Sequence, residues 1–251
     1  MTDICGDYYM TSQAELKQFA SLRLPKFRQK YGQFMVEGRK AVHEVFHSPL
    51  KVVKILATKW YYDKNDLEFE CDIISDQDNL RLSQFDTPPG IIAIVEIPQN
   101  QEWNQNQPLT LALDGISDPG NMGTIIRIAD WYGIKQILCS NDCVDVYNHK
   151  CLAATMGSFT RIECIYTDLV ETLKNQHVLG AFLEGQSIYQ TQISQPTVLV
   201  VGSESHGIRE SVKSVITTEI TIPKIGSAES LNAGVATAIL LDRLCVGNNQ
   251  R

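Results

Sequence analysis

The sequence predicts an α/β protein: a mostly parallel sheet with helices on both faces, preceded by a small α/β domain. Short apolar, β-branched runs such as residues 197–201 have the length of buried strands rather than helices. Segments with helical patterns alternate with these runs, which is typical of parallel sheets. Loops that contain glycine follow two of the runs, and open α/β sheets bind ligands at such strand ends.

Residues 1–98 predict a small domain of alternating short elements. Ser12 and Glu15 have the spacing of a capping box, so a helix is expected over residues 13–22. We expect strands at residues 34–36, 52–57, 73–74 and 91–97, and helices at 38–47 and near 79–85. The amide-rich residues 99–107, between Pro98 and Pro108, predict a linker.

Residues 108–251 predict six strands that alternate with helices. The strands are expected at residues 109–113, 136–139, 162–166, 178–183, 197–201 and 219–222, the fourth stopping near Gly185. Helices are expected at 121–132, 148–156 and 168–176, with Asp168 as N-cap of the third, and again from Ala233. The ends of the strands at 197–201 and 219–222 are expected to lie side by side and form a crevice.

Three stretches at predicted strand ends carry glycines and polar residues in order. They hold Asp114, Asp118 to Asn121, Gly123, Thr124 and Arg127 in the first, Gly202, Glu204 and Gly207 in the second, and Ile222, Pro223, Gly226 and Ser230 to Asn232 in the third. Together these stretches resemble the three signature motifs of the SpoU (TrmH-like) family of the SPOUT class, which are RNA ribose 2′-O-methyltransferases. The resemblance covers residues 109–240 well.

The resemblance implies a fold, a cofactor and partners. SPOUT proteins thread the C-terminal segment through a loop, so a trefoil knot is expected here, although periodicity does not predict it and knots are rare in proteins. S-adenosylmethionine is the expected cofactor, RNA the expected substrate and a homodimer the expected assembly. The separate N-terminal domain favours ribosomal RNA over transfer RNA and is expected to recognise the substrate.

The resemblance also assigns roles to individual residues. Arg127 is placed at the RNA site; because its guanidinium stays protonated, we expect it to bind a phosphate and polarise the ribose rather than to act as a base. Asn121 either caps a helix or touches the ribose, and Glu204 is expected to hold its loop or a neighbouring asparagine. Ser230 and Asn232 are expected to cap the last helix and face the RNA. The implied cofactor contacts are Gly202, Gly207, Ile222, Leu231, Leu183 and Gly185.

The charge distribution restricts where RNA could bind. The net charge is −7; residues 1–98 hold 12 basic and 14 acidic side chains, and residues 99–251 hold 10 and 15. Since phosphates are bound by lysine and arginine, any RNA contact is expected to be local. The best local patch is Arg23, Lys26, Arg28 and Lys30, which is either a phosphate-binding segment or a solvated connector.

Two patterns resemble metal sites but are interpreted otherwise. His43, Glu44 and His47 match HExxH, a zinc signature, yet Pro49 closes the predicted helix and no third ligand stands in a helical setting downstream. Cys139 and Cys143 have no second pair at zinc-finger spacing. No metal is therefore expected. The seven scattered cysteines, without an N-terminal signal sequence or an 18-residue apolar run, favour a cytoplasmic protein.

Other functions remain as alternatives. A transfer RNA 2′-O-methyltransferase, or a catalytically idle RNA-binding or ribosome-assembly factor, could use the same scaffold. The joint presence of Arg127, Glu204, Ser230 and Asn232 favours an active enzyme. A dinucleotide-dependent dehydrogenase is disfavoured because no G-x-G-x-x-G follows a predicted strand, and a zinc protease is the weakest alternative.

Overall fold

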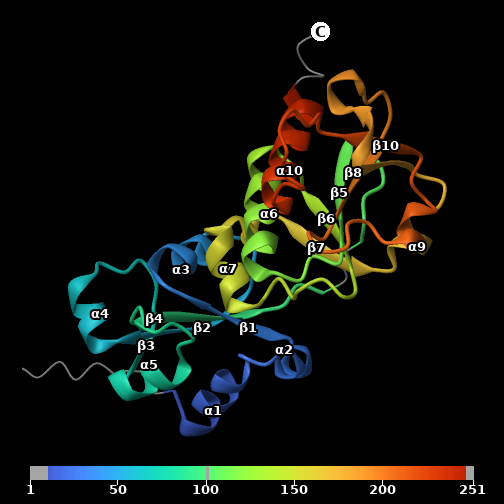
Figure 1. Ribbon diagram of the computed structural model, residues 1–251. Coiled ribbons are helices and arrows are strands. Elements are labelled where there is room, and N and C mark those ends of the chain that lie inside the picture. Colours follow the sequence, from blue (N-terminus) through green and yellow to red (C-terminus); the bar gives the residue numbers. More distant parts are fainter. Residues whose placement is uncertain (1–10, 100–101, 247–251) are drawn as a thin grey trace, which may run out of the picture. The chain divides into compact units, whose positions relative to one another are not determined.

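The computed structural model describes residues 11–99 and 102–246 (Figure 1). The chain divides into two compact units. The first comprises the residues up to Gln99 together with Tyr147–His149, and the second comprises the rest. Within the described residues no helix is long and apolar enough to cross a membrane.

The N-terminal unit is a four-stranded mixed sheet with helices around it. Strand β4 is antiparallel to both β1 and β2, and β3 is parallel to β2, in the order β1-β4-β2-β3. Leu16 and Phe19 of the first helix pack into a core with Met35, Leu56 and Ile92 of the sheet. The elements are α1 (Gln13–Ser21), α2 (Pro25–Tyr31), β1 (Gln33–Glu37), α3 (Arg39–Phe46), β2 (Val52–Thr58), α4 (Lys59–Lys64), β3 (Asp72–Ile74), α5 (Asp76–Leu82) and β4 (Ile91–Glu96).

Local capping explains where these helices begin and end. The capping box of Ser12 and Glu15 is present. Helix α5 begins three residues before the predicted 79–85, because the Ser75 hydroxyl accepts a hydrogen bond from the Asp78 N–H at 3.0 Å and fixes an earlier start. Helices α2 and α4 were not predicted; Gly32, with φ 62°, ends α2 in the left-handed conformation.

The C-terminal unit is the predicted α/β sheet, and every neighbouring pair of its six strands is parallel. Helices cover both faces: α6 and α10 lie side by side on one (Figure 1), and α8 and α9 pack over Ala112, Leu138 and Val200 on the other. The elements are β5 (Leu109–Asp114), α6 (Pro119–Trp131), β6 (Gln136–Ser140), α7 (His149–Thr155), β7 (Glu163–Thr167), α8 (Leu169–Leu173), β8 (His177–Ser187), β9 (Thr197–Gly202), α9 (Glu210–Lys213), β10 (Thr218–Thr221) and α10 (Ala233–Leu241).

The strand order corrects the expected crevice. The order is β10-β8-β9-β5-β6-β7, so β8 separates β9 from β10, and their ends do not lie side by side. Instead β9 pairs with β5, with Asp114 opposite Gly202 at the end of the ladder. The first and second motifs therefore begin at neighbouring strand ends. The trefoil knot stays a prediction.

Strand β8 also continues past the glycine that was expected to stop it. Gly185 has φ 146°, and a Cβ at this position would lie 2.7 Å from the Glu219 carbonyl oxygen. The pairing of β8 with β10 shifts register between Glu219 and Ile220. Gly185 therefore lets the strand run on closely against β10 instead of ending it.

Candidate active site at the carboxyl ends of the strands

A buried carboxylate ties the end of β5 to the loop that follows β9. Asp114 is 1% exposed. It accepts hydrogen bonds from the Arg209 N–H and Nε, each at 2.8 Å, and from Arg209 Nη2. Arg209 Nη1 also donates to Asp142 at 3.2 Å. Because a buried charge is costly without a partner, this pair fixes the geometry of both loops.

Arg209 was not among the predicted site residues. It lies seven residues after Gly202, and its partner Asp114 is 95 residues away in the chain, so no local pattern joins them. Hydrogen bonding from Ser140 and the charge of Arg209 both lower the pKa of Asp142, with Ser140 the larger cause. Hydrogen bonding to Asp114 raises the pKa of Arg209 in turn. Both shifts favour the charged forms of Asp142 and Arg209.

The loop after β9 turns back on itself and requires glycine at its start. Ser203 and Gly207 form a bridge, with the Gly207 N–H donating to the Ser203 carbonyl at 2.8 Å. A Cβ on Gly202 would lie 2.1 Å from the Gly207 carbonyl carbon, closer than any side chain tolerates. Gly207 adopts φ 66°. Gly202 therefore lets the loop fold closely back on itself, and Gly207 supplies the left-handed conformation of the turn.

We predict that Gly202→Ala destabilises the protein, whereas Gly226→Ala does not. The added methyl group at position 202 has no room, so we expect a loss of about 1–3 kcal/mol in the free energy of unfolding. A methyl group at position 226 would meet no heavy atom of a described residue within 4 Å, so this variant is the matched control. Urea denaturation of both variants measures the effect, and equal midpoints would show that the loop tolerates a side chain at position 202.

The three motifs meet in one chain of hydrogen bonds. Asn121 Nδ2 donates to Glu204 Oε1, and Asn232 Nδ2 donates to Asn121 Oδ1 at 2.8 Å. Asn232 Oδ1 in turn accepts from the N–H groups of Gly234 at 3.0 Å and Val235 at 3.2 Å, so Asn232 is the N-cap of α10. Glu204, Asn121 and Asn232, which we call the polar chain, thus connect elements that are 83 and 111 residues apart.

The side-chain amides of Asn121 and Asn232 can each be oriented, because the group at either end of the polar chain fixes which atom must face it. The helix N–H groups require an acceptor, so the Asn232 oxygen faces them and its NH₂ faces Asn121. An ionised Glu204 can only accept, so the Asn121 NH₂ must face it. Glu204 thus accepts a hydrogen bond from an asparagine, one of the two kinds of contact expected for it. Asp118, not Asn121, caps α6, accepting from the Asn121 N–H at 2.7 Å.

Arg127 lies farther along α6. Thr124 lies three residues before it. A Cβ added to Gly234 would lie only 3.0 Å from the Thr124 side chain, so this part of α6 packs against the start of α10. Arg127 is exposed and forms no hydrogen bond or ion pair with any described residue. Ser230 is also exposed, and no hydrogen bond joins it to the described part of the chain. Both side chains are therefore available to a ligand.

Five of the six predicted cofactor contacts fall into two groups, and the sixth, Leu231, lies just before α10. Gly202 and Gly207 belong to the loop after β9. Leu183, Gly185 and Ile222 gather where β8 passes the end of β10, since Thr221 Oγ1 donates to the Leu183 carbonyl at 3.0 Å. Leu183 is 73% exposed and Leu231 45% exposed. An exposed leucine such as Leu183 offers an apolar surface to a ligand group.

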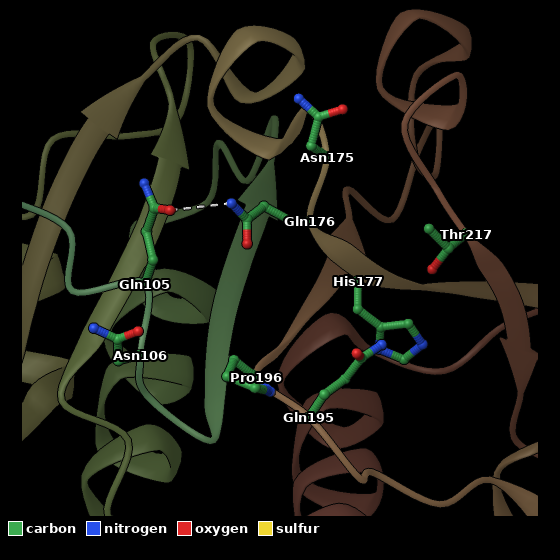
Figure 2. Close-up of a pocket in the computed structure, with 8 residues that line it drawn as sticks. All are labelled: Gln105, Asn106, Asn175, Gln176, His177, Gln195, Pro196 and Thr217. Atoms are coloured by element: carbon green, nitrogen blue, oxygen red, sulfur yellow. Dashed lines mark hydrogen bonds between the residues drawn. The ribbon is translucent and has the colours of Figure 1, made fainter.

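A polar pocket lies elsewhere in this unit (Figure 2). Its lining residues sit at the amino ends of strands: His177 begins β8, Pro196 precedes β9 and Thr217 precedes β10. Gln176 donates to Gln105 across it at 3.2 Å. Ligands of parallel sheets bind at the carboxyl ends, where the motif residues are, so we do not assign the cofactor to this pocket.

The predicted phosphate patch is corrected in part. Arg28 is 3% exposed, and its Nη1 donates to the carbonyls of Leu22 at 2.9 Å and Arg23 at 3.1 Å, so it is a structural residue. Arg23 is exposed but donates to the Ala20 and Arg81 carbonyls. Lys26 and Lys30 remain exposed and lie over the rings of Phe27 and Tyr31.

Comparison with known proteins assigns both units to described families. The SpoU rRNA Methylase family matches residues 108–242, and the MRM3-like substrate binding domain matches residues 13–93. The chain is 31% identical over 238 residues to the 23S rRNA (guanosine(2553)-2′-O)-methyltransferase RlmP of Bacillus subtilis, covering 92% of this chain and 95% of that protein. This chain belongs to the SpoU rRNA methylase family.

Two solved structures are similar over nearly the whole chain. A protein of the TrmH family of RNA methyltransferases from Porphyromonas gingivalis has a TM-score of 0.82 and 35% identity, covering 93% of this chain and 98% of that one. An S-adenosylmethionine-bound rRNA methyltransferase from Sinorhizobium meliloti has a TM-score of 0.80 and 26% identity, with coverages of 93% and 95%. The fold of both units is therefore one that known methyltransferases use.

Proposed function

We propose that this chain methylates the ribose 2′-hydroxyl of a guanosine in the large-subunit ribosomal RNA. It is an S-adenosylmethionine-dependent RNA 2′-O-methyltransferase, as its family membership indicates. The polar chain of Glu204, Asn121 and Asn232 supports the activity best, because it joins all three motifs at the carboxyl ends of the strands. The guanosine and the large-subunit RNA are taken from RlmP, which matches over 92% of this chain.

The reaction joins the 2′-oxygen to a methyl carbon and breaks that carbon's bond to sulfur. S-adenosylmethionine supplies an electrophilic methyl group on a positively charged sulfur. In our proposal Arg127 binds the phosphate beside the target ribose and orients the hydroxyl for in-line attack. The guanidinium is always protonated, so it cannot take the hydroxyl proton; that proton passes to the neighbouring phosphate oxygen and then to water.

The polar chain holds the elements that surround the substrate. Asn232 is fixed by the N-terminus of α10, and it fixes Asn121, which in turn fixes Glu204. In our proposal the methyl donor binds between the loop after β9 and the Leu183–Ile222 region, and the polar chain sets the distance from these loops to α6. Ser230, exposed beside Asn232, binds the RNA.

We propose that Lys26 and Lys30 of the N-terminal unit bind RNA phosphates. Their ammonium groups lie 5.0 and 5.1 Å from the ring centroids of Phe27 and Tyr31, which hold the flexible side chains on one exposed helix. Replacing both with glutamate is expected to weaken RNA binding at least about tenfold and to lower the salt dependence of binding. Filter binding at several salt concentrations measures both, and an unchanged salt slope would remove α2 from the RNA site.

We further propose a homodimer that works in the cytoplasm. Trp131 of α6 is 84% exposed and Val235 of α10 is 50% exposed, and these two helices pack against each other. Large exposed apolar side chains on paired helices are typical of a protein interface. Of the described cysteines none forms a disulfide, which agrees with a reducing compartment.

Mapping the methylated nucleotide tests the proposed function. Large-subunit RNA from a strain that lacks this gene is incubated with the protein and S-adenosylmethionine. Primer extension at low nucleotide concentration should then stop at one new site, next to a guanosine. Stops that appear only in transfer RNA would favour the transfer RNA alternative. Binding of ribosomal RNA without any new stop would favour the idle RNA-binding factor.

A further inference from the structure

The N-terminal unit contains a second cluster with the chemistry of a metal site. His43 and His47 lie one turn apart on α3, and their ring centroids are 4.5 Å apart. Glu68, from the segment between α4 and β3, meets both of them. Its Oε1 lies 2.7 Å from His43 Nε2 and 2.8 Å from His47 Nε2. This carboxylate provides a third possible ligand atom, which the sequence pattern alone did not supply.

The cluster fits a transition-metal ion in both size and ligand type. The three ligand atoms all lie within 4.8 Å of one another. In a tetrahedral zinc site with bonds of about 2.0–2.2 Å, the ligand atoms are roughly 3.3 Å apart, so little movement would admit an ion. Two imidazole nitrogens and one carboxylate oxygen select zinc-like ions over magnesium or calcium, which prefer oxygen ligands. Water would take the fourth position.

The segment that carries Glu68 is held at α3 by a separate contact. The rings of Phe46 and Phe69, each next in sequence to a ligand, have centroids 5.1 Å apart. Phe46 also meets the His47 ring edge-on at 5.2 Å. These apolar contacts bring the carboxylate to the imidazoles without a metal. A preformed site binds an ion more tightly because less chain entropy is lost on binding.

The ion pairs alone contribute little to holding the cluster together. The side chains of His43, His47 and Glu68 are 58%, 50% and 46% exposed. Exposed pairs of this kind stabilise a protein by about 0–1 kcal/mol at most. An ion bound by all three side chains would hold the segment far more firmly, and the exposure gives it a direct path from solvent.

We propose that His43, His47 and Glu68 bind one zinc-class divalent cation, which fastens the segment between α4 and β3 to α3. The role is structural, and it is independent of methyl transfer. This proposal departs from the expectation, drawn from the HExxH and Cys139/Cys143 patterns, that no metal binds. Zinc binding should therefore raise the melting temperature.

Zinc titration of the metal-free protein, residues 1–251, tests the proposal. Competition with a chromophoric chelator should give one tight site per chain, and Co²⁺ should give visible d–d absorption bands. The variant His43→Ala/His47→Ala and the near-isosteric Glu68→Gln should each weaken this site at least about tenfold and abolish the thermal shift. Glu70→Gln, two residues from Glu68 and also exposed, and His206→Ala are matched controls that should bind zinc as the wild type does.

The outcomes separate this site from other zinc ligands. Zinc held by cysteine thiols instead would persist in the double histidine variant, and that result would overturn the proposal. The absence of a tight site in the wild type would overturn it as well. Circular dichroism of each variant establishes that it is folded, and Glu68→Gln keeps the test valid if the histidine variant does not fold.

Discussion

Arg127→Ala should reduce methyl transfer by on the order of 10²–10³-fold while leaving S-adenosylmethionine binding unchanged. The side chain is exposed on α6 and has no hydrogen bond or ion pair among the described residues, so its removal should not disturb the fold. The variant loses a positioned positive charge at the substrate phosphate. Removing one such hydrogen-bond donor from an active site typically lowers the rate by about 10²–10³-fold. Single-turnover transfer of a labelled methyl group measures the rate.

Two controls make the Arg127 result specific. Lys174→Ala removes another exposed cation of the same unit, one that pairs only with Glu171 among the described residues, and should keep the full rate. Arg127→Lys keeps the charge but loses the planar fork that grips a phosphate, so it should recover only part of the activity. A fully active Arg127→Ala enzyme would contradict the role assigned to this residue.

Asn121→Ala should lower the rate of methyl transfer by roughly 10–100-fold, the second largest effect that we expect. Asn121 is the middle of the polar chain, so its loss frees both Glu204 and Asn232 from α6. A shift of catalytic groups by about 1 Å can lower a reaction rate by about 100-fold. Because the polar chain is largely exposed, the free energy of unfolding should change by less than about 1 kcal/mol.

A double-mutant cycle tests whether the polar chain acts as a unit. Glu204→Ala alone should also slow the reaction, and Asn121→Ala together with Glu204→Ala should be little slower than the worse single variant. Gln176→Ala, an amide variant at the amino ends of the strands (Figure 2), is the matched control and should be fully active. Effects on the rate that multiply independently would show that the two side chains act separately.

The strands could be predicted from the sequence because a buried strand needs a short run of apolar, β-branched residues, and such a run is visible locally. All six predicted strands of the C-terminal unit are present within a few residues, and so is the capping role of Asp168. The strand order could not be predicted the same way. Strand β8 lies between β9 and β10, and pairing between strands depends on contacts far apart in the chain.

For the candidate site, the motifs identified which residues take part, but they did not predict which of these residues contact one another. The sequence places Asn121 at a helix start, but its hydrogen bonds to Glu204 and Asn232 appear only once the strands are assembled. Arg209 carries no local signal at all, since its partner Asp114 is remote. For Arg28 the local pattern was misleading. The basic run suggested that its side chain contacts a phosphate, whereas the fold buries this side chain against main-chain carbonyls.

One measurement tests the central claim most directly: transfer of tritium from labelled S-adenosylmethionine to RNA from a strain that lacks this gene, resolved by size. We predict label in the large-subunit ribosomal RNA band, absent with Arg127→Ala and retained after base hydrolysis as a ribose 2′-O-methyl group. Failure to bind S-adenosylmethionine, together with no label in any RNA band or in unmodified precursor particles, would contradict the claim that this chain is an RNA 2′-O-methyltransferase.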